Sequence, residues 1–214
     1  MTEDSYIDRY GYHIKGQRPD VDPQKAAKET SRESKWLEME RNWDLYLGKK
    51  HATLHRRIKK GIPDSLRSLI WKKLADPNYE AEKSNRQPLD VLAVGERQQC
   101  WDVIDADVDR TFRTVEFFSN RSFQESLRKV LYAESILDPE LGYTQGMSFL
   151  AAMFLCYLTE DEALWCFHNI LHDPLYNLRE NFITGFPGFH KTSKVWEAAL
   201  KSKYPEVLSH FEDI

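Results

Sequence analysis

Two short segments carry side chains that could act on a phosphoryl group without gaining or losing a proton. Residues 104–110 read IDADVDR and end in Arg110, and residues 143–147 read YTQGM and include Gln145. Arginine is permanently charged and presents a planar fork of donors that suits phosphoryl oxygens. Glutamine offers one amide oxygen that accepts and one NH2 group that donates. Neither segment supplies an obvious nucleophile, metal ligand or phosphate-binding loop.

The spacing of Asp107 and Arg110 places both side chains on one face of a predicted helix. Taken alone, an Asp-x-x-Arg pair is most often a surface ion pair that contributes a few tenths of a kcal/mol. The pair alone therefore does not identify a functional site.

A nucleotide-binding loop is poorly supported elsewhere in the chain. The segment GFPGFHKT at 185–192 comes nearest to a Walker loop, but His190 stands where the motif requires glycine before the lysine. No strand pattern precedes it, and the alternative is a turn that connects two helices.

Histidine and cysteine patterns also fail to predict a site. His51 and His55, and likewise His168 and His172, are spaced i, i+4, as metal ligands on one helix face can be. Neither pair encloses the glutamate of H-E-x-x-H, so ordinary helix positions are favoured and no metal is predicted. The serines lack the G-x-S-x-G context, and no cysteine stands beside a suitable histidine.

A basic segment, KKHATLHRRIKKG, contains no acidic residue. Its cations are Lys49, Lys50, Arg56, Arg57, Lys59 and Lys60. A solvated helix face is the favoured interpretation, and a docking strip for an acidic partner or an anionic membrane surface is the alternative.

Composition limits the classes of protein to consider. The 214 residues are 41% hydrophobic, which is enough to form a buried core. Their net charge of -4 gives no overall positive potential that would favour nucleic-acid binding. The three cysteines lack C-x-x-C spacing, the N-terminus lacks an apolar signal core, and the longest apolar run, at 149–158, is too short to span a bilayer. We expect a reduced, cytoplasmic protein without a transmembrane segment.

Apolar spacing predicts an all-α fold. Residues 1–30 are poor in aliphatic side chains and contain Gly11, Gly16, Pro19 and Pro23, which indicates a flexible or extended lead-in before a domain at 31–214. From there apolar residues recur at helical spacing, with Asp64 a candidate N-cap and Thr159–Glu162 a capping box. No sustained period-two alternation predicts a sheet.

Three motifs, in order, resemble those of the TBC domain, a module of GTPase-activating proteins for Rab GTPases. They are GIPDSLRSLIWKKL at 61–74, IDADVDRTF at 104–112 and YTQGMSFLAAMFL at 143–155. The resemblance runs from about Trp36 to Ile214, where the family continues into further helices. It therefore implies a TBC-type domain that lacks its last helices.

The resemblance also assigns roles. It implies that Arg110 is an arginine finger and Gln145 a glutamine finger, both inserted into the nucleotide site of a partner. Asp107 would orient the guanidinium, and Tyr143 with Gly146 would support the glutamine loop. Four further motif residues would serve folding: Gly61, Pro63, Arg67 and Trp71.

The function implied is acceleration of GTP hydrolysis by a Rab-type GTPase in its GTP form, in vesicle trafficking. The chain would need no cofactor of its own, because the partner carries GTP and Mg²⁺, and it would reach endomembranes through that partner. The alternatives are a helical scaffold that binds a GTPase or trafficking protein without catalysis, and a structural domain whose motif matches are accidental.

Overall fold

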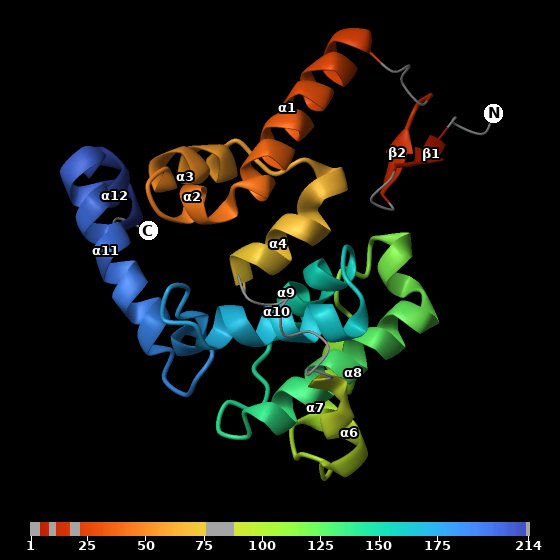
Figure 1. The fold of residues 1–214 in the computed structure, drawn as a ribbon. Coiled ribbons are helices and arrows are strands. Elements are labelled where there is room, and N and C mark those ends of the chain that lie inside the picture. Colours follow the sequence, from red (N-terminus) through yellow and green to blue (C-terminus); the bar gives the residue numbers. More distant parts are fainter. Residues whose placement is uncertain (1–4, 9–11, 18–21, 76–87, 213–214) are drawn as a thin grey trace.

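Helices build nearly all of the protein. The computed structural model describes residues 5–8, 12–17, 22–75 and 88–212 (Figure 1). In chain order the elements are β1 Ser5–Ile7, β2 His13–Lys15, α1 Pro23–Arg41, α2 Trp43–Leu47, α3 His51–Lys59, η1 Asp64–Leu66, α4 Arg67–Ala75, η3 Pro88–Asp90, α6 Val91–Val94, α7 Trp101–Val108, η4 Glu116–Ser119, α8 Arg121–Leu137, α9 Met147–Leu155, α10 Glu160–His172, η5 Leu178–Asn181, α11 Pro187–Lys203 and α12 Pro205–Glu212. The all-α prediction is confirmed, since strand in the described residues is confined to the antiparallel β1–β2 hairpin.

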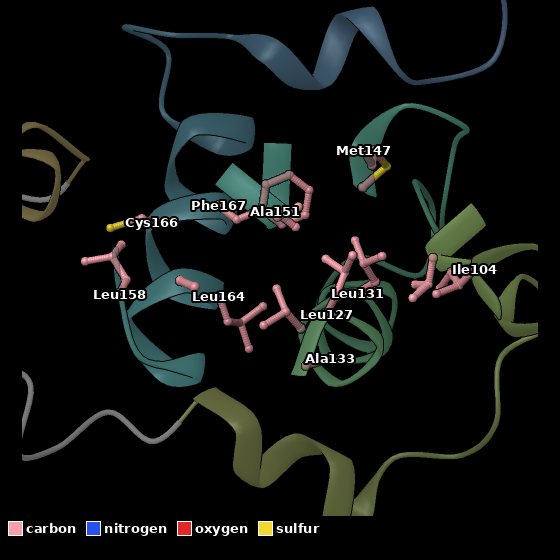
Figure 2. Close-up of a cluster of buried hydrophobic side chains, with 14 of the residues drawn as sticks. Ile104, Leu127, Leu131, Ala133, Met147, Ala151, Leu158, Leu164, Cys166 and Phe167 are labelled. Atoms are coloured by element: carbon pink, nitrogen blue, oxygen red, sulfur yellow. The ribbon is translucent and has the colours of Figure 1, made fainter. Parts of the chain in front are cut away.

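The larger core lies where α7, α8, α9 and α10 pack together. α8 is amphipathic and buries Leu127, Val130 and Leu131 along one face. α9 is apolar along most of its length, and its Met147 and Ala151 are fully buried, whereas Phe149 and Met153 on another side remain exposed. Figure 2 shows these side chains converging with those of α10. This core holds α7 and the start of α9 in fixed positions.

A second apolar cluster joins α1 to α4. Its buried members are Trp36, Met39, Trp43, Tyr46, Leu54 and Ile70, which come from all four helices. All six are among the apolar residues that were expected to recur at helical spacing after residue 31. α4 connects this cluster to the larger core through its packing on α10.

The last two helices form an arm that leaves the body of the protein (Figure 1). α11 packs against η5 and α12. The arm exposes more than half of five large apolar side chains, namely Phe189, Val195, Trp196, Tyr204 and Phe211.

Local capping fixes where several helices begin. The predicted capping box is present, because Thr159 accepts from the Glu162 backbone N–H and the Glu162 carboxylate accepts from the Thr159 backbone N–H. α1 begins at Pro23, inside the predicted lead-in, where Asp22 caps the helix and Pro23 takes its first turn. Within the segment 1–30, residues 1–4, 9–11 and 18–21, including Gly11 and Pro19, lie outside the described residues.

Across the described residues, no helix combines the length and the apolarity that crossing a bilayer requires.

Candidate functional site

Arg110 lies two residues beyond the end of α7. Ile104 and Val108 anchor α7 in the core, and Asp107, on its last turn, is also buried. The backbone N–H of Arg110 donates to the Asp107 carbonyl at 3.2 Å, so the chain keeps a helical turn past Val108. The predicted i, i+3 neighbourhood of Asp107 and Arg110 is therefore present, although Arg110 itself stands in a turn.

The buried carboxylate of Asp107 binds the guanidinium of Arg110. Arg110 Nε donates to Asp107 Oδ1 at 2.5 Å, and Arg110 Nη2 contacts the same oxygen. The Arg110 side chain is 54% exposed, whereas that of Asp107 is 2% exposed. A buried carboxylate thus orients a cation that is presented to solvent.

The other carboxylate oxygen of Asp107 connects to the second motif. The Tyr143 hydroxyl donates to Asp107 Oδ2 at 2.6 Å. Burial, followed by this hydrogen bond, raises the pKa of Tyr143 above its ordinary value, so the hydroxyl stays protonated as a donor. Asp107 therefore joins the Arg110 turn to the segment that carries Gln145.

A buried pair of hydroxyls makes a second connection that sequence reasoning missed. The Thr111 hydroxyl donates to the Asp107 carbonyl at 2.7 Å and lies 2.8 Å from the Ser148 hydroxyl, from which it can accept. Both residues are buried. A serine within the apolar run at the start of α9 was the one local sign that this position needed a polar partner.

Gln145 stands in a turn fixed on both sides. Before it, the Thr144 hydroxyl donates to the Phe182 carbonyl at 2.7 Å. After it, Gly146 has φ +105, a left-handed conformation that favours glycine, and buried Met147 starts α9. The Gln145 side chain itself is exposed. The turn therefore presents an amide group from a constrained backbone.

The remaining motif residues lie apart from this cluster. Gly61 has φ +89, and its carbonyl accepts from Arg32 Nη2 at 3.0 Å. Pro63 precedes η1, Arg67 starts α4, and Trp71 packs edge-on against Phe154 and Tyr157 near the end of α9. The contacts of Trp71 join α4 to the larger core.

Asp64 is not the N-cap that we expected. It lies inside the 3-10 turn η1, whose N-cap is Pro63 and makes no side-chain cap hydrogen bond. The Asp64 carboxylate instead contacts Arg67 Nη1 at 2.7 Å and accepts from the Tyr157 hydroxyl at 2.8 Å. The tertiary contacts outcompete the local cap.

The Walker-like segment is not a phosphate loop. α11 begins at Pro187, and both Lys191 and Thr192 are exposed within the helix. A phosphate cradle needs an irregular loop with backbone N–H groups that face the ligand. The alternative, a helix connection, agrees with this geometry.

The two histidine pairs differ. His51 and His55 are exposed on α3 with ring centroids 6.4 Å apart. His168 and His172 on α10 lie with ring centroids 4.2 Å apart, and both approach the buried carboxylate of Glu134. Sequence reasoning missed Glu134 because it lies on another helix, 34 residues before His168.

The basic segment faces a cleft of about 500 Å³ between α1 and α3. Arg57 and Lys60 line it together with Lys28, Arg32 and Lys35 of α1. Basic side chains of a second helix thus join the segment at this cleft, although Arg32 is also paired with Glu29 of α1.

Comparisons with known proteins support the motif assignment. A family model described as the Rab-GTPase-TBC domain matches residues 64–214. TBC1 domain family member 10A of Mus musculus is 34% identical over 165 residues, which are 75% of this chain and 33% of that protein. TBC1 domain family member whacked of Drosophila melanogaster is 30% identical in an alignment of 215 positions that covers 99% of this chain and 58% of that protein. The chain thus spans about a third to three fifths of these relatives.

Two solved structures share the fold. The crystal structure of the Chlamydomonas flagellar RabGAP TBC domain aligns with a TM-score of 0.64 and 22% identity, over 97% of this chain and 69% of that one. The Ypt/Rab-GAP domain of Gyp1p aligns with a TM-score of 0.59 and 22% identity, over 76% of this chain and 62% of that one.

Proposed function

Because the chain belongs to the Rab-GTPase-TBC domain family, we propose that it is a GTPase-activating protein for a Rab-type small GTPase in its GTP form. Arg110 and Gln145 enter the partner's nucleotide site, and the partner supplies GTP and Mg²⁺. The chain acts in vesicle trafficking and meets endomembranes through that partner.

The role of Arg110 follows from the charge of the reaction. Hydrolysis spreads negative charge over the transferring γ-phosphoryl group, and the permanently charged fork of Arg110 stabilises that charge. An arginine finger supplied in trans accelerates hydrolysis by roughly 10³ to 10⁵. At about 1.4 kcal/mol per tenfold change, this is on the order of 4 to 7 kcal/mol of transition-state stabilisation.

Gln145 positions the attacking water. Its amide oxygen accepts a hydrogen bond from the water, and its NH2 group donates toward the phosphate. Because neither Arg110 nor Gln145 has to titrate, the site needs no base or nucleophile of its own. Positioning and electrostatic stabilisation supply most of the catalysis in phosphoryl transfer.

One observation carries the proposal: the buried carboxylate of Asp107 contacts Arg110 through one oxygen and Tyr143 through the other. This arrangement couples the orientation of the exposed guanidinium to the segment that presents Gln145. Such preorganisation before the partner arrives reduces the cost of ordering both groups at the transition state.

The test is single-turnover GTP hydrolysis by a panel of Rab GTPases with the full chain, Arg110→Lys and Gln145→Ala. We expect one or more GTPases to be accelerated, about 10³-fold or greater loss with Arg110→Lys, and about 10²-fold or greater loss with Gln145→Ala. Arg113→Lys and Gln99→Ala change nearby exposed residues of the same types and are expected to keep full activity.

Binding measured in parallel separates the alternatives. Binding to a GTPase with no acceleration by the unaltered chain would favour the non-catalytic scaffold. Full acceleration by Arg110→Lys would refute the arginine-finger mechanism.

A further inference from the structure

Three potential ligand atoms converge between α8 and α10. His168 Nδ1 lies 3.1 and 3.2 Å from the two carboxylate oxygens of Glu134, and His172 Nε2 lies 3.4 Å from Glu134 Oε1. One ligand atom from each of the three residues can be chosen so that all lie within 4.8 Å of one another. We propose that Glu134, His168 and His172 form a binding site for a divalent transition-metal ion of the zinc class.

The distances also fit three ligands that share one metal ion. Charge-assisted N–H···O bonds are about 2.7–2.9 Å long, and each contact in this cluster is longer. Ligands about 2.0–2.2 Å from a tetrahedral zinc ion lie about 3.4 Å from one another. The histidine-to-carboxylate distances of 3.1 to 3.4 Å already approach that separation.

The helix pattern aims the ligands at one point. His168 and His172 lie one turn apart on α10, and Glu134 and Asp138 lie one turn apart along α8 and its C-cap. α8 and α10 pack closely in the larger core, so the two i, i+4 pairs face each other. Asp138 Oδ2 is 3.5 Å from His172 Nε2, and both oxygens of this carboxylate are bound by Arg179.

Charge at the cluster favours a dication. The carboxyl group of Glu134 is fully buried. The neighbouring guanidinium of Arg179 is shared between Asp138 and Glu140, so the carboxyl groups of Glu134, Asp138 and Glu140 together exceed the charge of this guanidinium.

The site has a route for the metal and a structural consequence. The histidine side chains are 24% and 30% exposed, so an ion can enter from the histidine side without opening the core. A bound ion would join α8 to α10, and these two helices pack against α7 and α9, which flank Arg110 and Gln145. The expected effect is stabilisation of the fold that presents the fingers.

The test is titration of the untagged, metal-free chain with Zn²⁺ and, separately, Co²⁺. We expect one equivalent of Zn²⁺ to bind and, at a free concentration about 100 times the dissociation constant, to raise the melting temperature by about 5–10 °C. The Co²⁺ complex should show visible absorption without a thiolate charge-transfer band, because the ligands are nitrogen and oxygen. The assay involves no GTPase, so its outcome is independent of the proposed activity.

Matched variants locate the ion. His168→Gln and His172→Gln should each weaken Zn²⁺ binding about 100-fold, whereas His51→Gln and His55→Gln, which alter the exposed pair of identical spacing, should not. Failure of the unaltered chain to bind stoichiometric Zn²⁺ would overturn the proposal, and so would undiminished binding by the His168→Gln, His172→Gln double variant. A thiolate band in the Co²⁺ spectrum would assign the ion to cysteine and equally refute the site.

Discussion

Two Asp-x-x-Arg pairs in this chain each bind a tyrosine hydroxyl, and they differ in whether the arginine is presented to solvent. In the first, Asp107 is 2% exposed and Arg110 54% exposed. In the second, Asp64 is 24% exposed and Arg67 28% exposed.

The position of the tyrosine explains the difference. Tyr143 donates to the far oxygen of Asp107, so the carboxylate stands in the middle and Arg110 at the solvent end. Tyr157 contacts both Asp64 and Arg67, and the Arg67 guanidinium also lies over its ring at 5.2 Å from the centroid. Arg67 is therefore bound within the fold, whereas Arg110 is presented to solvent.

The largest expected difference between the pairs is in catalysis. Arg110→Lys should reduce GTPase acceleration about 10³-fold or more, since lysine cannot reproduce the planar fork. Arg67→Lys should leave the rate per bound complex unchanged and lower the melting temperature. Single-turnover hydrolysis and thermal unfolding of both variants check this, and an equal loss of rate in both would remove the distinction.

The aspartates should differ next. Asp107→Asn replaces the carboxylate that binds Arg110 and Tyr143 with a neutral amide. We expect GTP hydrolysis in the complex to be about 10- to 100-fold slower, because the guanidinium is no longer held in place. Asp64→Asn should cost about 0.5–1 kcal/mol of stability without a change in rate, because its partly exposed pair is screened by water. A normal rate with Asp107→Asn would show that Arg110 needs no orientation by this carboxylate.

The smallest expected difference between the two pairs is in the stability effect of removing each tyrosine hydroxyl. Tyr143→Phe leaves a buried oxygen of Asp107 without its donor and should lower the free energy of unfolding by about 1–2 kcal/mol. Tyr157→Phe should cost about 0.5–1 kcal/mol, since water can replace the hydroxyl at the more exposed Asp64. Urea unfolding measures both values. A larger loss with Tyr157→Phe than with Tyr143→Phe would contradict the deeper burial of Asp107 relative to Asp64.

Local features were predictable from the sequence, whereas tertiary contacts were not. The capping box at Thr159 depends on neighbouring residues, and it appears as expected. The local signs at Asp22 and Pro23 were also present and place the start of α1 earlier than the domain boundary we predicted.

The sequence motifs and their order indicated Arg110 and Gln145, and the i, i+3 spacing indicated Asp107. The hydrogen bond from Tyr143 to Asp107 joins residues 36 positions apart, so local spacing did not predict it. For the same reason, the sequence did not show that Glu134 lies beside His168 and His172. It also suggested an N-cap role for Asp64, whose carboxylate instead contacts Arg67 and Tyr157. Sequence periodicity predicts which face of a helix is buried, and it does not predict which helix lies opposite.

The most direct test of the central claim is the affinity of the chain for a Rab GTPase loaded with GDP, measured with and without aluminium fluoride. This ligand completes a mimic of the transition state, and a protein that stabilises the transition state binds the mimic more tightly than the ground state. We predict that aluminium fluoride strengthens binding of the unaltered chain and of Arg67→Lys by 100-fold or more, on the order of a transition-state analogue, and that Arg110→Lys abolishes this gain. An equal gain with Arg110→Lys would contradict the assignment of Arg110 as the arginine that acts in the partner's active site.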